Sequence, residues 1–259
     1  MGAELITGCD DSYALVAALT VPPMRRYAER HGLAFSFARF GPTDRAAAWS
    51  KVSAIKAALL RGADPVIWID ADALIVRSNR DIREGIDASK DVFIGPRFNA
   101  GVLVIRNTAW SLWFLDKVWN NQLVPEHATW ENAALVYTLG YRQRLGRGEQ
   151  DCPDESILSH IGGLDWRWNC IPHLCHSARD AYIRHYAGLP NRVRVALMRR
   201  DLAIPGYGYV VAPCARLALR LALFDERMKQ KAATATLPGW YIGRRLAGRA
   251  LRGLLSPVL

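Results

Sequence analysis

The sequence lacks the features that mark exported and membrane-spanning proteins. No run of 18 apolar residues occurs, so no membrane-spanning helix is expected. No basic segment stands ahead of a long hydrophobic one near the N-terminus, and we therefore expect no signal peptide. Ile6 stands where N-myristoylation needs serine or threonine. The predicted location is the cytoplasm.

Cysteine is too scarce for a disulfide framework. The five cysteines are an odd number, which together with the missing signal peptide favours a reducing compartment. Cys170, His173, Cys175 and His176 lie close together, but their spacing matches no standard zinc pair. We favour loop and core positions for these residues over a zinc site.

Acidic residues are scarce only near the C-terminus. The chain has a net charge of +10, and residues 192–259 carry 13 Lys and Arg against three acids, whereas residues 1–191 carry 21 of each. The basic excess therefore belongs to a C-terminal segment. We predict a folded domain over residues 1–195 and a basic helical extension over residues 196–259.

The basic extension has three interpretations: a solvated pair of helices, an anchor on anionic lipid, or a nucleic-acid patch. Residues 214–232 and 239–255 show helical apolar spacing interleaved with arginine, although four glycines weaken the second pattern. Arginine opposite tryptophan and leucine favours an anionic membrane surface, here the inner face of the membrane. No recognised nucleic-acid module accompanies the basic residues, so no nucleic-acid partner is expected.

The order of predicted elements indicates an α/β fold. The chain has 259 residues, of which 51% are hydrophobic, and this suffices for one large α/β domain. Strands are predicted over residues 4–8, 33–37, 66–69, 92–95, 101–106 and 182–187. Helices are predicted over residues 46–61, 110–119 and 131–139, and over residues 13–32 in two pieces broken at Pro22 and Pro23. This β-α-β-α-β beginning predicts a Rossmann-like half with a mainly parallel sheet flanked by helices.

Two carboxylates follow the most apolar predicted strand. Asp70 and Asp72 come directly after residues 66–69, at the carboxyl end of a strand, where open α/β sheets bind ligands. Residues two apart on an extended chain point the same way, so both carboxylates can face one ligand. Like charges there are costly unless a cation or hydrogen-bond donors share the site. We expect a divalent metal bound to substrate phosphates; the alternative is a polar turn.

His185 follows a later predicted strand and is a candidate third ligand. An imidazole with carboxylates suits Mn²⁺, whereas a purely oxygen site suits Mg²⁺. Such a metal would bridge the two phosphates of a nucleotide-sugar. Gly188 would let the backbone approach those phosphates. Taken alone, His185 would be interpreted as a hydrogen-bonded core histidine.

Eight short stretches carry a resemblance to a known family. In chain order they are YAERHG (27–32), WSK (49–51), WIDADAL (68–74), FNAGV (98–102), RNTAWS (106–111), WENAA (130–134), WRWN (166–169) and HYAG (185–188). With these, the chain resembles the retaining GT-A glycosyltransferases of family 34, the galactosyl-, mannosyl- and xylosyltransferase group, and more distantly family 8. The resemblance covers about residues 4–190. It implies the GT-A fold, a Rossmann-like fold of nucleotide-diphospho-sugar transferases.

The resemblance implies roles for the matching residues. The metal ligands would be Asp70, Asp72 and His185. The donor nucleotide and its diphosphate would contact Thr7, Gly8, Lys51, Ala71, Gly188 and Arg192. The donor sugar would be lined by Asn99, Ala100 and Gly101. The residues beside the anomeric carbon would be Glu131 and Asn132. Two positions depart from the family: Asn132 stands where Gln is common, and Arg192 or Arg194 must replace a lysine that usually follows the His-x-x-Gly stretch.

The implied activity is transfer of a hexose or pentose, with retention, from a nucleotide-sugar to a glycan or lipid-linked acceptor. UDP-galactose is the best donor candidate, with Mn²⁺ or Mg²⁺ as cofactor. Retention can proceed through a carboxylate nucleophile or by a front-face route, and we favour Glu131 as a stabiliser of positive charge over a nucleophile. Its structural alternative is a helix N-terminal residue favoured by the helix dipole. Trp130 and Trp166 are candidate acceptor-stacking residues.

Two other functions fit parts of the sequence. A nucleotidyltransferase also uses carboxylates, a metal and a nucleotide, but it would show a glycine-rich, basic loop after the first strand, where residues 7–11 are acidic. A non-catalytic nucleotide-sugar-binding protein would carry residues 70–72 as a plain turn.

Overall fold

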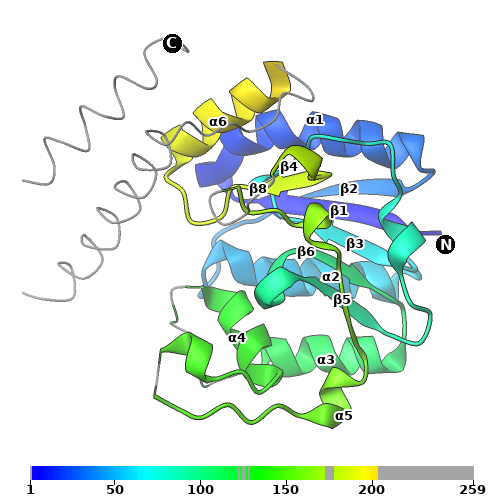
Figure 1. Cartoon of the computed structure of the whole chain (residues 1–259), viewed down its shortest axis with the longest axis vertical. Helices are drawn as coiled ribbons and strands as arrows, with labels where there is room; N and C mark the ends of the chain where they lie inside the picture. Colours follow the sequence, from blue (N-terminus) through cyan, green and yellow to red (C-terminus); the bar gives the residue numbers. More distant parts are fainter. Residues whose placement is uncertain are drawn as a thin grey trace, which may run out of the picture.

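The computed structural model describes residues 2–121, 123, 127, 129–146, 148–172 and 178–203. A six-stranded sheet forms its centre, in the order β2-β1-β3-β6-β5-β7 (Figure 1). The strands are β1 (Glu4–Cys9), β2 (Ala34–Arg39), β3 (Val66–Ile69), β5 (Val92–Gly95), β6 (Asn99–Ile105) and β7 (Ile161–Gly163). β6 runs antiparallel to its neighbours β3 and β5, and the other pairs are parallel. The predicted mainly parallel sheet flanked by helices is thus confirmed.

Helices cover both faces of this sheet (Figure 1). They are α1 (Ala14–Arg30), α2 (Ser50–Leu60), α3 (Ala109–Trp119), α4 (Trp130–Thr138), α5 (Glu155–Leu158) and α6 (Asn191–Ala203). One core cluster packs α2, α3 and α4 against strand residues such as Ile6 and Trp68, and a second packs α1 against Leu5 and Ile67. Both β1 and β3 are buried on both faces, and β3 is accordingly apolar throughout, whereas β1 also buries Glu4 and Thr7.

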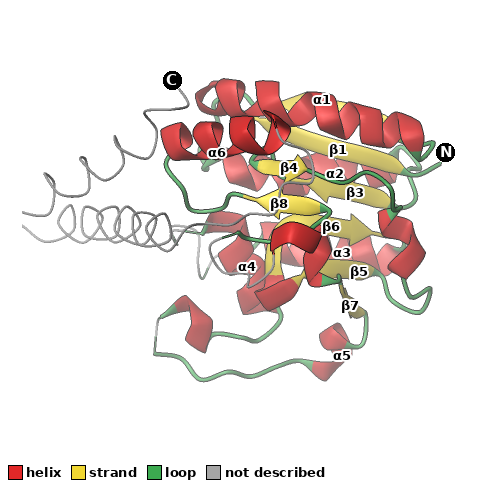
Figure 2. Cartoon of the chain, turned by 45° about the horizontal axis from the view of Figure 1, so that its top comes forward, coloured by secondary structure: helices red, strands yellow, loops and turns green. Residues whose placement is uncertain are grey.

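A second, two-stranded sheet lies beside the end of the central one. It pairs β4 (Ala73–Ile75) with β8 (Ile183–His185) in antiparallel register, so that Ala73 faces His185. Figure 2 shows it next to α6, and Leu74 and Val193 share a core cluster. The sequence gives no periodic signal for a three-residue strand, and β4 was not predicted.

The predicted break at Pro22 and Pro23 is wrong, because α1 is one continuous helix of 17 residues. Each proline removes a helical hydrogen bond. Packing compensates: Pro23, Met24 and Tyr27 are buried, and Thr20 Oγ1 donates a hydrogen bond of 2.7 Å to the Ala71 carbonyl oxygen. Tertiary contacts therefore override local propensity here.

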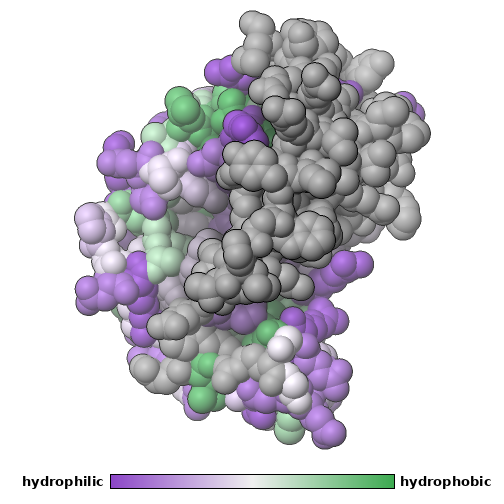
Figure 3. Space-filling view, turned by 90° about the vertical axis from the view of Figure 1, so that its left-hand side faces the viewer, coloured by the Kyte–Doolittle hydropathy of each residue, from purple (hydrophilic) through white to green (hydrophobic). Residues whose placement is uncertain are grey.

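The predicted boundary at residue 195 falls inside α6, which continues to Ala203. The helices predicted over residues 214–232 and 239–255 lie outside the described residues, as do three of the four zinc candidates, His173, Cys175 and His176. Within the described part of the chain, no helix is both long and apolar enough to cross a membrane. On the face in Figure 3, the described residues present hydrophilic side chains interspersed with small hydrophobic patches.

Candidate active site

The topology of the sheet brings the carboxyl ends of β1 and β3 and the start of β6 to the same end of the sheet, the carboxyl edge. β1 and β3 are parallel and end at that edge, and β6 starts there because it runs the opposite way. The contact is direct: the Asp70 amide, just after β3, donates a 2.8 Å hydrogen bond to the Gly101 carbonyl oxygen near the start of β6. Residues 70–72 and 99–101 therefore adjoin each other.

Asp70, Asp72 and His185 form a group that could hold a metal ion. Each offers one ligand atom, and these atoms all lie within 4.8 Å of one another. His185 Nε2 lies 3.3 Å from Asp72 Oδ1 and 3.7 Å from Asp70 Oδ2. The carboxylates converge through a turn closed by the Ala73 amide on the Asp70 carbonyl oxygen, so the extended geometry predicted for residues 70–72 is wrong.

The other oxygen of each carboxylate is already satisfied by the protein. Asp70 Oδ1 accepts hydrogen bonds from Lys51 Nζ at 2.8 Å and Trp68 Nε1 at 2.6 Å. Asp72 Oδ2 lies 3.0 Å from Arg194 Nη2. One oxygen of each carboxylate thus faces the imidazole. Two carboxylate oxygens and one imidazole nitrogen are a donor set that fits Mn²⁺.

Asp72 is held in its charged form although it is buried. Burial raises the pKa of a carboxyl group, but His185, Arg194 and Lys51 hold the pKa of Asp72 at about 2. Metal ligands must be deprotonated. Asp72 therefore meets that requirement at neutral pH without rearrangement.

Lys51 forms a buried bridge between the metal-site turn and α4. Its ammonium lies 2.8 Å from Asp70 Oδ1, 2.7 Å from Glu131 Oε1 and 3.1 Å from the Ala100 carbonyl oxygen, which matches its three N–H donors. Burial alone lowers the pKa of a lysine, but the two carboxylates raise the pKa of Lys51 above its ordinary value. Its predicted contact with the diphosphate would require one of these hydrogen bonds to be exchanged.

Glu131 keeps one carboxylate oxygen without a partner. Its side chain is buried, and Oε2 has no hydrogen bond to the described residues. Burial raises the pKa of Glu131, Lys51 opposes the rise, and Asp70 adds to it. Buried polar atoms are rarely left unpaired. Oε2 is therefore an available acceptor for a ligand.

Asn132 is partly committed to the structure. Its Oδ1 accepts a 2.7 Å hydrogen bond from the Ala100 amide. Its NH₂ group remains available to donate to a ligand. The Asn132 side chain, shorter than the Gln common in the family, thus holds residues 99–101 in place.

Asn169 is the residue whose importance the sequence did not reveal. It closes the stretch 166–169, to which no role was given, and its side chain contacts both Asn99 and His185. The only signal in the sequence is its place at the end of the aromatic stretch 166–169.

The remaining predicted residues occupy varied places. The Thr7 side chain is buried and its Oγ1 has no partner among the described residues. Arg192 is exposed, whereas Arg194 contacts Asp72. Trp130, 44% exposed, begins α4 with a φ of 44°, and Trp166 is 37% exposed in a 3₁₀ turn. Three others are Gly8, one residue before the end of β1, the buried Ala71 in the metal-site turn, and Gly188, exposed with a φ of 70°.

Gly101 has no room for a side chain. A Cβ atom there would approach the His185 ring atoms Cε1 and Nδ1 and Asn99 Oδ1 to less than 3.0 Å. We expect Gly101→Ala to lower the free energy of unfolding by about 1–3 kcal/mol, as overpacked cores do. Gly163→Ala is the matched control, because nothing lies within 4 Å of its Cβ position. Urea unfolding measures both, and equal effects would contradict the steric argument.

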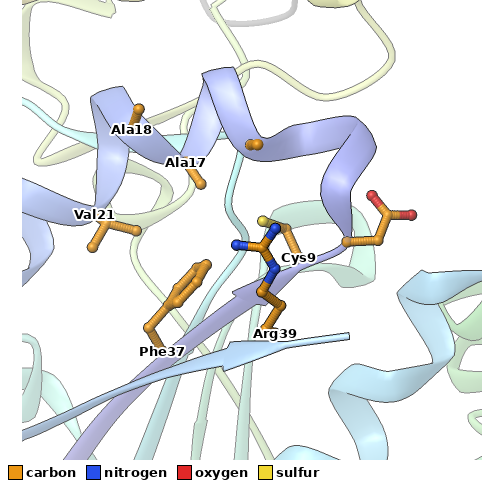
Figure 4. Close-up of a pocket in the computed structure, with 8 residues that line it drawn as sticks. Cys9, Ala17, Ala18, Val21, Phe37 and Arg39 are labelled. Carbon is orange, nitrogen blue, oxygen red and sulfur yellow. The ribbon is translucent and has the colours of Figure 1, made fainter. Parts of the chain in front are cut away.

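A cavity of about 230 Å³ lies apart from this group, between α1 and the edge strand β2. Phe37 and Arg39 of β2 face Ala17 and Val21 of α1 across it (Figure 4). Cys9 lies at its end, and burial together with Asp10 raises the pKa of that thiol. The cavity is therefore lined mainly by apolar side chains, with Asp10 and Arg39 as charged residues and the Cys9 thiol in its protonated form.

Comparison with known proteins points to glycosyltransferases. No family model matches the chain. It is 32% identical to a probable glycosyltransferase 6 of Oryza sativa subsp. indica, over 44% of this chain and 25% of that protein. It is 30% identical to an uncharacterized alpha-1,2-galactosyltransferase of Schizosaccharomyces pombe, over 40% of this chain and 39% of that protein. The chain therefore spans only a quarter to two fifths of these relatives.

The fold has a match among solved structures. A glycosyltransferase involved in the glycosylation of the major capsid of PBCV-1 superimposes with a TM-score of 0.56 at 18% identity, over 77% of this chain and 100% of that one. The predicted GT-A fold is confirmed. The narrower assignment to family 34 stays a prediction.

Proposed function

We propose that this chain, whose fold is that of the GT-A glycosyltransferases, transfers a glycosyl group from a nucleotide-sugar and depends on a divalent metal. The convergence of Asp70, Asp72 and His185 at the edge where β1 and β3 end and β6 begins carries the proposal. These three residues would hold the metal, with Mn²⁺ favoured by the imidazole and Mg²⁺ as the alternative. The metal would neutralise the diphosphate that leaves.

The other residues would position the donor sugar. Lys51 fixes Glu131 through Oε1, so that Oε2 can accept a hydrogen bond from the sugar or stabilise positive charge at the anomeric carbon. Asn132 would donate through its NH₂ group. A carboxylate already bonded to an ammonium is a weaker nucleophile, which supports the front-face route with retention over a covalent intermediate. Phosphate contacts of Lys51 and Arg192 belong to the same proposal.

The donor is proposed to be UDP-galactose. The similarity to a protein described as an alpha-1,2-galactosyltransferase supports this choice, with UDP-xylose and GDP-mannose as competitors. The acceptor would be a glycan or lipid-linked sugar, stacked on Trp130 or Trp166, both exposed.

A thermal-shift screen tests the function. The full chain is heated with UDP-galactose, UDP-xylose or GDP-mannose, each with and without Mn²⁺. One donor is expected to stabilise the protein only with Mn²⁺, by about 2.7 kcal/mol at a hundredfold excess over Kd, and to release its nucleoside diphosphate. Stabilisation without release would favour a nucleotide-sugar-binding protein. The proposal is overturned if no donor produces either the stabilisation or the release.

The basic segment after residue 192 is proposed to attach the protein peripherally to the inner face of the membrane, in the cytoplasm. Its charge supports the proposal, since each Lys or Arg near an anionic surface contributes about 1 kcal/mol. The full chain should co-sediment with anionic vesicles at low salt and not with zwitterionic ones. Equal sedimentation with both would contradict an electrostatic attachment.

A further inference from the structure

We infer that Asn169 is a positioning residue that holds the proton of His185 on Nδ1 and thereby directs the Nε2 lone pair toward Asp70 and Asp72. The inference rests on the proposed metal site. Asn169 and His185 are both buried, with 4% and 3% of their surfaces exposed. Their side chains are therefore fixed by protein partners and not by water.

The orientation of the Asn169 amide follows from its first partner, Asn99. One amide atom lies 3.0 Å from the Asn99 carbonyl oxygen and 2.9 Å from Asn99 Oδ1. A backbone carbonyl oxygen can only accept, so that atom must be the NH₂ nitrogen. Asn99 Oδ1 also accepts from the Gly101 amide at 2.9 Å, which identifies it as oxygen. The Asn169 amide therefore has one satisfactory orientation.

The orientation of Asn169 determines the tautomer of His185. With its nitrogen facing Asn99, Asn169 places Oδ1 2.9 Å from His185 Nδ1. An amide oxygen only accepts, so Nδ1 carries the hydrogen. In the neutral form that a metal ligand requires, the lone pair of the ring is then on Nε2, the atom that lies 3.3 Å from Asp72 Oδ1. The opposite tautomer would point an N–H at the carboxylates and leave no ring lone pair for a cation.

The hydrogen bonds extend back to the backbone of Asp70, another of the proposed ligands. Gly101 donates to Asn99 through its amide and accepts from the Asp70 amide through its carbonyl oxygen. The path from the Asp70 backbone to the His185 ring thus runs through Gly101, Asn99 and Asn169. Asn169 joins the proposed donor-sugar loop to the imidazole.

Two glycines make room for this arrangement. A Cβ atom at Gly95 would approach Asn169 Nδ2 and Cβ to less than 3.0 Å, and one at Gly101 would approach the His185 ring equally closely. Neither Asn169 nor His185 could occupy its present position beside a larger residue. The space around both side chains is therefore specific to these partners.

Mn²⁺ affinity measured by electron paramagnetic resonance on the full chain is the first test. Asn169→Leu removes the acceptor, and we expect it to weaken Mn²⁺ binding by about 10- to 100-fold, as loss of such outer partners does. Asn169→Asp keeps an acceptor for His185 Nδ1, and its Mn²⁺ affinity should fall much less. Asn107→Leu, which removes an amide bonded to the Leu59 carbonyl oxygen elsewhere, should leave the affinity unchanged. Unaltered affinity in Asn169→Leu would overturn the inference.

The protonation of the ring in the metal-free protein is the second test. ¹⁵N-histidine labelling at a pH where the ring is neutral, with His185→Gln to assign the signal, reports whether the ring hydrogen is on Nδ1 or on Nε2 in the wild-type chain. We expect an attached hydrogen, and an unprotonated Nδ1 would overturn the inference whether or not metal binds. If wild-type protein binds no Mn²⁺, the proposed metal site fails, while this measurement still decides the role of Asn169. Because this measurement uses the wild-type chain, it also tests the role of Asn169 if the Asn169→Leu variant does not fold.

Discussion

Replacing Asp72 with asparagine is expected to lower metal-dependent turnover of the donor by about 10³-fold, equivalent to about 4 kcal/mol of transition-state stabilisation. The substitution keeps the shape of the side chain and removes the charge that faces His185 Nε2 at 3.3 Å. It also leaves the buried Arg194 without its carboxylate partner. Release of nucleoside diphosphate from the donor identified by thermal shift, with and without Mn²⁺, measures the effect.

The matched control for this variant is Asp116→Asn. Asp116 lies on α3 and pairs with Lys56, and 46% of its side chain is exposed. It should retain full turnover. Urea unfolding of both variants separates lost chemistry from lost structure. Turnover within a few-fold of wild type in a folded Asp72→Asn protein would contradict the metal-ligand role.

Replacing Lys51 with methionine is expected to destabilise the fold by about 3–5 kcal/mol, the cost of leaving buried charges without their partner. Both Asp70 and Glu131 would lose their ammonium partner, and only 6% of the surface of Glu131 is exposed. Lys56→Met is the matched control on the same helix. Lys56 also pairs with an aspartate, but 35% of its side chain is exposed, so its loss should cost only about 0–1 kcal/mol.

The pH dependence of that destabilisation identifies its source. The pKa of Glu131 is already raised in the folded state, and removing Lys51 removes the charge that opposes the rise. The folded variant would then hold the Glu131 proton to higher pH than the unfolded chain, so its stability falls as pH rises through that interval. The difference in unfolding free energy between wild type and Lys51→Met should therefore be smaller at pH 6 than at pH 8. Adding Glu131→Gln should recover part of the loss, and equal losses in Lys51→Met and Lys56→Met would contradict the buried bridge.

Short-range patterns predicted the elements that their own residues determine. The apolar run of β3 and the carboxylates after it were identified because burial on both faces leaves a continuous signal. Pro22 and Pro23 misled the prediction because the contacts that hold α1 together come from Ala71 and the core, outside the helix.

The candidate site was predictable in its members and not in its connections. Asp70, Asp72 and His185 were all put forward, and the structure brings them together. The bond between Lys51 and Glu131 joins positions 80 apart, and no local pattern encodes it. The role of Asn169 depends on the direction of hydrogen bonds, which only the three-dimensional arrangement defines.

The crowding around Gly95 and Gly101 has a consequence for how this site could change during evolution. Each glycine adjoins a side chain that a Cβ atom would displace, Asn169 for Gly95 and His185 for Gly101. A side chain could be accepted at position 95 or 101 only after its neighbour had become smaller or moved. The substitution at 169 would therefore have to precede the one at 95, and the substitution at 185 the one at 101. The two positions of each pair are thus expected to change together.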